Sequence, residues 1–143
     1  MNKSELYIVL AASAGLAFFA YSKMNHRMAD HHTPAPGDPL VTVNLPLTLS
    51  SQASAGKTKF EANCAACHGL NASGNDGAGP PLVHKIYEPS HHADESFQIA
   101  ASRGVRSHHW RFGNMPPVAD VTRDDVAMII AYIRELQREN GIY

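Results

Sequence analysis

Both cysteines of this chain lie in the five-residue string CAACH, at residues 64–68. The string offers two nucleophilic sulfurs and one metal-ligating imidazole within a short stretch of backbone. C-x-x-C-H spacing is typical of the attachment of a c-type haem, in which the sulfurs form thioethers and the histidine ligates the iron. The string therefore predicts one covalent haem c, bound through Cys64 and Cys67, with His68 as an axial ligand of the iron.

Three other uses of a close cysteine pair fit the sequence less well. A disulfide here would close a very short loop, and the stabilisation by a disulfide grows with loop length. A thioredoxin-like redox pair needs a βαβ context, and no convincing strand precedes the string. A structural zinc site usually has four ligands, and there is no second cysteine pair. Haem attachment is the interpretation that remains.

The second axial ligand decides what the iron can do, because methionine opposite histidine raises the reduction potential and suits electron transfer. Among the five methionines, Met115 is placed best. It precedes Pro116, which favours extended backbone, and Pro116 with Pro117 stiffens the loop. Met128 lies in the middle of an expected helix, away from its apolar stripe, and is expected to pack or face solvent. The other three precede the domain: Met1, Met24 and Met28.

Nine histidines are unusual for a chain of 143 residues. Besides His68, the domain contains His84, His91, His92, His108 and His109. Three interpretations stay open for these five. They can be ordinary surface or hydrogen-bonding side chains. They can bind copper or another cation, since imidazole suits such metals. His108 or His109 can also take the place of Met115 at the iron.

Three helices are expected. The first begins at Ser50 or Ser51 and presents Gly56, Phe60 and Cys64 on one face, four residues apart. The glycine-rich segment 69–81 predicts a loop. A second helix covers residues 94–103 and stops at Gly104. The third has Thr122 as its N-cap and ends at residues 140–141. Its apolar stripe is Val126, Ile129, Ile130, Ile133 and Leu136.

From about residue 50 to residue 136, the chain resembles the class I monohaem c-type cytochromes. The matching motifs are G-x-x-x-F-x-x-x-CAACHG at 56–69, GPPL at 79–82, NMPP at 114–117 and AYI at 131–133. The resemblance implies an all-α fold, with three or more helices wrapped around one covalent haem. It also implies His68 and Met115 as the axial ligands.

Further roles follow from the same resemblance. Gly56 and Phe60 match the positions at which the first helix crosses the last, opposite Tyr132. The carbonyl group of Pro80 matches the acceptor for the ring N–H of His68, a bond that would fix the ring and strengthen it as a donor. Trp110 or Arg111 would lie within reach of a haem propionate.

The N-terminal residues 6–21, LYIVLAASAGLAFFAY, are almost uniformly apolar. Their length falls between the roughly 7–15 apolar residues of a signal peptide and the about 20 of a membrane-spanning helix. We expect an uncleaved anchor; the alternative is a signal peptide cleaved after Ala20-Tyr21-Ser22. One basic residue, Lys3, precedes the apolar run and two, Lys23 and Arg27, follow it. By the positive-inside rule this distribution weakly favours a cytoplasmic location for the domain. Because c-type haem is attached outside the cytoplasm, we nevertheless expect the domain on the periplasmic side of a bacterial inner membrane, either anchored or soluble.

The predicted organisation has three parts. Residues 1–23 are a signal-anchor or signal peptide, residues 24–49 are a linker containing proline and histidine, and residues 50–143 are the cytochrome c domain. The segment HHTPAPGDP at 31–39 is expected to be extended and semi-rigid. Pro46 reduces any strand at residues 40–47 to an edge strand or a docked extended segment.

The formal net charge of −1 carries no basic excess of the kind that nucleic-acid binding requires. We expect an electron carrier rather than an enzyme, either as an independent shuttle or as a subunit of a respiratory or oxidoreductase complex, with redox proteins as its partners. The alternative is a haem enzyme or a gas- or redox-sensing module, in which the sixth coordination position of the iron is open or labile.

Overall fold

The computed structural model describes Tyr21 and residues 35–143. The chain divides into two compact units, Met1–Thr33 and Pro34–Tyr143. Apart from Tyr21, the predicted signal or anchor at residues 1–23 lies outside the described residues, as does the linker up to residue 34. Among the helices that the structure describes, none is long and apolar enough to cross a membrane.

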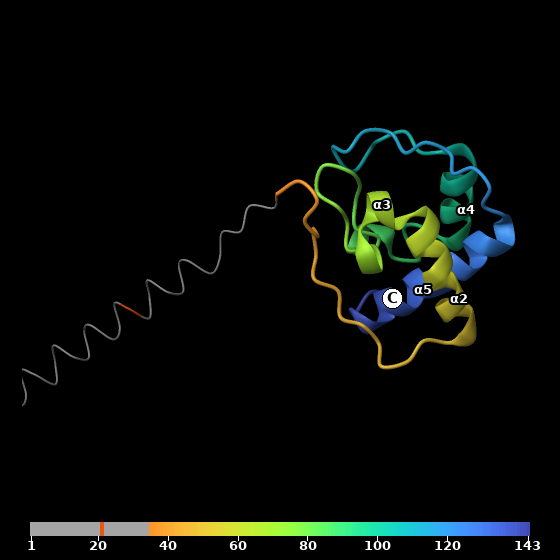
Figure 1. Ribbon diagram of the computed structural model, residues 1–143, viewed down its shortest axis with the longest axis horizontal. Coiled ribbons are helices and arrows are strands. Elements are labelled where there is room, and N and C mark those ends of the chain that lie inside the picture. Colours follow the sequence, from red (N-terminus) through yellow and green to blue (C-terminus); the bar gives the residue numbers. More distant parts are fainter. Residues whose placement is uncertain (1–20, 22–34) are drawn as a thin grey trace, which may run out of the picture. The chain divides into compact units, whose positions relative to one another are not determined.

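The second unit is built from helices (Figure 1). They are α2 (Ser51–Asn63), α3 (Ala65–His68), α4 (Asp94–Arg103) and α5 (Arg123–Glu139), with 3₁₀ turns η1 (Leu70–Ala72) and η2 (Lys85–Tyr87). No sheet forms within residues 35–143, where β-pairing is limited to two isolated bridges, Asn75 with Gly79 and Val105 with Met115. The prediction of an all-α fold is confirmed. The two 3₁₀ turns were not predicted.

Helices α2 and α5 cross with their backbones almost in contact (Figure 1). A Cβ atom added to Gly56 would lie 1.8 Å from the carbonyl oxygen of Met128. One turn further along α2, the rings of Phe60 and Tyr132 pack with their centroids 5.8 Å apart. Both side chains are fully buried. The expected crossing of the first and last helices at these residues is confirmed.

The long helix α5 begins at a capping box. The Thr122 hydroxyl accepts the backbone N–H of Asp125, and the Asp125 carboxylate accepts the backbone N–H of Thr122. This arrangement satisfies two N–H groups that the first turn would otherwise leave unpaired. The predicted apolar stripe is buried throughout, at Val126, Ile129, Ile130, Ile133 and Leu136. Burial of this stripe makes α5 the centre of the core.

A buried arginine on α5 ties the middle of the chain to the core. Arg134, only 8% exposed, donates to the Asp94 carboxylate at 2.9 Å. It also donates to the carbonyl oxygens of Tyr87, at 2.7 Å, and His92, at 2.6 Å. Because a buried guanidinium is stable only when its donors are paired, these bonds fix η2 and the turn before α4 against α5.

Residues 35–49 run along the surface of the same unit as an extended segment. The N–H groups of Leu40 and Val41 both donate to the carbonyl oxygen of Ser73. Further along, the backbone N–H of Asn44 donates to the Asn140 side chain at 2.9 Å. This part of the predicted linker is thus hydrogen-bonded to the helical unit at two points along its length.

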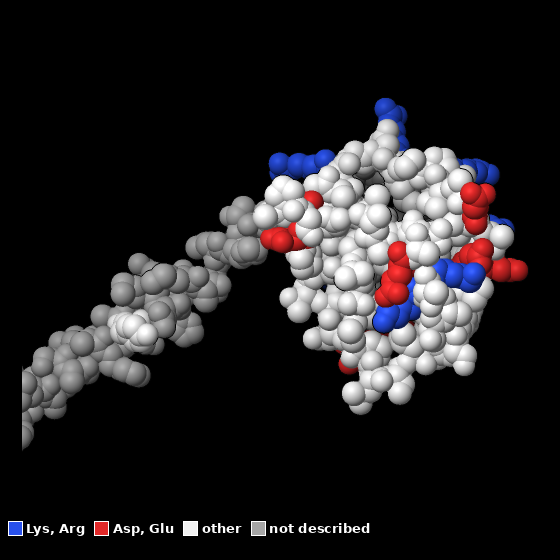
Figure 2. All heavy atoms as spheres, viewed as in Figure 1, with Lys and Arg blue, Asp and Glu red and all other residues white. Residues whose placement is uncertain are grey.

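On the face seen in Figure 2, acidic and basic side chains are interspersed.

Candidate haem site

A largely apolar cavity of about 550 Å³ opens between α2, α4, α5 and the segment that follows α4. Ligand pockets commonly have volumes of about 300–1,000 Å³. Four of the five residues predicted from sequence to serve the site line this cavity: Cys64, His68, Pro80 and Met115. The fifth, Cys67, is an exposed residue of α3 beside it. The structure therefore brings the predicted site residues together at one place.

The CAACH string consists of Cys64, which is the N-cap of α3, followed by the single turn of α3. Cys64 ends α2 by donating its N–H to the Phe60 carbonyl at 2.8 Å, and its own carbonyl accepts the N–H of His68 at 2.9 Å. Both cysteines are free thiols. Burial raises the pKa of the Cys64 thiol to about 11, with a smaller contribution from Cys67. Since neither sulfur is in a disulfide, both are available for thioether formation at the edge of the cavity.

A backbone hydrogen bond fixes the orientation of the His68 ring. Its Nδ1 lies 2.9 Å from the carbonyl oxygen of Pro80. A carbonyl can only accept, so Nδ1 carries the hydrogen and Nε2 keeps its lone pair. Burial lowers the pKa of His68, which favours the neutral, metal-ligating form. A Cβ at Gly79 would lie 2.6 Å from the Cys67 carbonyl oxygen, so glycine lets this segment approach α3 closely.

Met115 is held on a second wall of the same cavity. Its N–H and C=O both pair with the backbone of Val105, each at 2.9 Å. A Cβ at Gly104 would meet the Met115 carbonyl oxygen at 2.4 Å, so this pairing depends on a glycine at the end of α4. Sequence reasoning missed the contribution of Val105, because an isolated bridge leaves no periodic pattern in the sequence.

Trp110 and Arg111 were both considered as partners of a haem propionate. Trp110 lines the cavity, whereas Arg111 is exposed and does not. The buried indole N–H of Trp110 has no hydrogen-bond partner among the described residues. It does lie near the Tyr87 hydroxyl, where it partly offsets the rise in the Tyr87 pKa that burial causes. A buried donor at this wall fits a cavity that receives an anionic or carbonyl group.

The additional histidines divide into two sets. His92, His108 and His109 line the cavity, whereas His84 and His91 do not. His84 has a structural contact, because its Nδ1 accepts the N–H of Ile86 at the start of η2. Desolvation and the neighbouring imidazoles of His108, His92 and His91 lower the pKa of His109.

A comparison with protein families decides how this site is interpreted. The family model described as Cytochrome c matches residues 53–137. The chain belongs to the cytochrome c family. No match to a curated protein was found. The matched range contains the CAACH string, both walls of the cavity and the α2–α5 crossing.

Membership of the cytochrome c family implies haem-based electron transfer with covalently bound haem c, and the family typically consists of electron carriers. The cavity fits that group on three observations: free thiols at its edge, an imidazole with a free Nε2, and a buried indole donor. A cytochrome c also implies redox proteins as partners.

Arg134 was a second omission of the sequence analysis. It lies four residues after Ile130, so helical spacing puts it on the buried face of α5. A charged residue at such a position signals a buried hydrogen-bond network. Here that network fixes the backbone of His92 at the cavity.

Proposed function

We propose that this protein carries electrons on a single haem c, bound covalently through Cys64 and Cys67, with His68 and Met115 as the axial ligands of the iron. The observation that supports this most strongly is that His68 and Met115 line one cavity, with His68 presenting a free Nε2. When bound, the haem supplies a one-electron Fe(III)/Fe(II) couple whose potential depends on the axial ligands.

The protein's own residues would hold and tune that group. The Cys64 and Cys67 sulfurs would keep the macrocycle permanently attached. The Pro80 carbonyl holds the His68 ring in place and increases its basicity as a ligand. The backbone of Met115 is fixed by its pairing with Val105, so the thioether would be offered to the iron from a wall of defined position.

Two protein ligands at the iron would leave no position for a substrate, which favours a carrier over an enzyme. The alternative is a haem enzyme or a gas- or redox-sensing module, with an open or labile sixth position. The specific observation in its favour is that His109, a possible acid, base or competing ligand, lines the same cavity.

We further propose that the protein acts on the periplasmic side of a bacterial inner membrane. The apolar residues 6–21 supply an anchor or a signal peptide. Electrons would pass through the surface around α3, where Cys67 is exposed and the Leu70 side chain is 69% exposed. Residues 64–72 include no lysine, arginine, aspartate or glutamate, and a small contact of low charge suits short-lived encounters with redox proteins.

Replacing Met115 tests the assignment of the axial ligand. In Met115→Ala the haem should remain attached, while its reduction potential should fall on the order of 100 mV, a fraction of the roughly 0.8 V that axial ligands span. Redox titration of the purified protein measures this. Met128→Leu, which conserves volume at a half-buried methionine outside the cavity, is the control. An unchanged potential in Met115→Ala would exclude Met115 as the ligand.

A further inference from the structure

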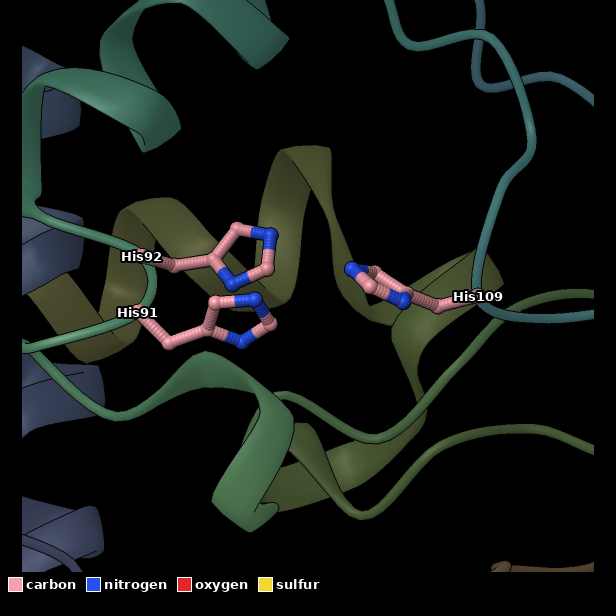
Figure 3. Close-up of side chains that lie close together, drawn as sticks. All are labelled: His91, His92 and His109. Atoms are coloured by element: carbon pink, nitrogen blue, oxygen red, sulfur yellow. The ribbon is translucent and has the colours of Figure 1, made fainter.

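Three histidine side chains that the haem does not require meet beside the cavity. His91 and His92 come from the turn between η2 and α4, and His109 comes from the segment after α4 (Figure 3). The rings of His91 and His92 lie next to each other, and the ring of His109 faces them. Each can offer a ring nitrogen, and these three nitrogens all lie within 4.8 Å of one another.

Two of the three rings already have the hydrogen bond that metal-ligating histidines usually have. Nδ1 of His91 and Nδ1 of His92 both contact the carbonyl oxygen of Ile86, at 2.9 and 2.6 Å. Because a carbonyl only accepts, both Nδ1 atoms carry hydrogen and both Nε2 atoms keep a lone pair. A backbone carbonyl that fixes the tautomer in this way is the usual outer partner of a histidine that binds a metal.

The turn that presents these two rings is held rigidly. The N–H groups of His91 and His92 donate to the carbonyl oxygen of Glu88, at 3.0 and 2.8 Å. The carbonyl oxygen of His92 accepts from the buried Arg134, at 2.6 Å. A metal site gains affinity when its ligands are fixed before the ion arrives.

We propose that His91, His92 and His109 bind a divalent transition-metal ion of the Zn²⁺ and Cu²⁺ class. A set of three imidazoles suits these ions, whereas Mg²⁺ and Ca²⁺ require oxygen ligands. In tetrahedral coordination with metal–nitrogen bonds of about 2.1 Å, the ligand nitrogens lie about 3.4 Å apart, so closing the site shortens the nitrogen–nitrogen separations by up to about 1.4 Å. His91 and His109 are exposed, so the ion can enter from solvent and keep water at its remaining position.

Occupancy would join two parts of the chain. The ion would bridge the turn at residues 91–92 to the segment that contains His109 and, six residues later, Met115. Such a bridge would restrain the wall of the cavity on which Met115 lies. The inference does not depend on the identity of the axial ligands, because none of the three histidines is assigned to the iron.

Calorimetric titration of the full-length haem protein with Zn²⁺ tests the site. The titration uses a His31→Gln/His32→Gln background, which removes the adjacent histidine pair in the N-terminal part of the chain. We expect one Zn²⁺ per protein. His91→Gln and His109→Gln should each weaken binding at least about tenfold. His108→Gln is the matched control, since this exposed neighbour of His109 is outside the cluster, and should change affinity less than about twofold.

Equal weakening in the His108→Gln control, or no Zn²⁺ binding in the background protein, would overturn the proposal. A changed visible haem spectrum in His109→Gln would also overturn it, because His109 would then be a ligand of the iron. X-ray absorption at the zinc edge provides a test that needs no cluster variant. Scattering from three imidazoles supports the site, and a shell of oxygen atoms alone contradicts it.

Discussion

The pair Cys64 and Cys67 illustrates how much a few adjacent residues can specify. Their spacing to each other and to His68 indicates one chemistry, and α3 puts all three within a single turn at the cavity edge. Met115 was identified by weaker signals, namely two following prolines and a resemblance. Val105, which holds Met115 in place, could not be identified, because its role depends on a contact between backbones.

The covalent attachment of the haem is predicted to depend on both cysteines. In Cys64→Ala/Cys67→Ala, the haem should be lost when the protein is denatured, since no thioether remains. Haem absorbance after denaturing electrophoresis measures this. Met128→Leu should retain its haem under the same conditions. Haem that stays attached to the double variant would contradict the assignment of the attachment site.

The helices were largely predictable from sequence, and the physical reason is visible in each of them. The N-cap serine, the capping box at Thr122 and the stop at Gly104 are local signals, and all three operate as expected. The short turns η1 and η2 are different. They have no apolar period of their own, and they depend on contacts with distant residues such as Arg134.

The crossing of α2 and α5 yields a prediction at the scale of elements. Alanine at Gly56 normally favours a helix by roughly 1 kcal/mol. Here its Cβ would meet the Met128 carbonyl oxygen at 1.8 Å and force the helices apart. We expect a net loss of about 1–3 kcal/mol in the free energy of unfolding, measured by urea denaturation of the haem protein. Ser54→Ala, at an exposed position of α2, should change it by less than about 0.5 kcal/mol. A more stable Gly56→Ala variant would contradict the close crossing.

The start of α5 gives a prediction about pH. Lys59, together with hydrogen bonds from Thr122, holds the pKa of Asp125 well below its usual range. A carboxyl group with a lowered pKa in the folded state contributes stability that is complete above its unfolded-state pKa of about 3.9. This contribution is lost progressively as the pH falls from there toward the folded-state pKa. We therefore expect Asp125→Asn to lower the urea midpoint at pH 7. The difference in midpoint between this variant and the wild-type protein should be smaller at pH 3.

The neighbouring carboxylate provides the control for this pH experiment. Asp124 also lies in the first turn of α5, so Asp124→Asn tests whether a general interaction with the helix start gives the same result. A deficit of the same size and pH dependence in both variants would contradict a specific role for Asp125. So would a deficit in Asp125→Asn that does not change between pH 7 and pH 3.

At the scale of the whole molecule, the cavity is assembled from segments that are far apart in the sequence. His68 approaches from α3, Met115 from the segment after α4, and the core of α5 lies beneath both. The family motifs indicated that these parts meet. A docked extended segment was one alternative for residues 40–47, and a metal site was one for the histidines, but the sequence did not indicate where that segment docks or which three histidines converge at the rim of the cavity. Such features depend on tertiary contacts that leave no local pattern in the sequence.

The proposed electron carrier requires that the protein fill both axial positions of the iron. The visible spectrum of the dithionite-reduced full-length protein, recorded with and without carbon monoxide, tests this most directly. We expect sharp low-spin c-type bands that do not change when carbon monoxide is added. A shift of the bands on addition of carbon monoxide would mean an open or easily displaced sixth position. That result would contradict the account and favour an enzyme or a sensor.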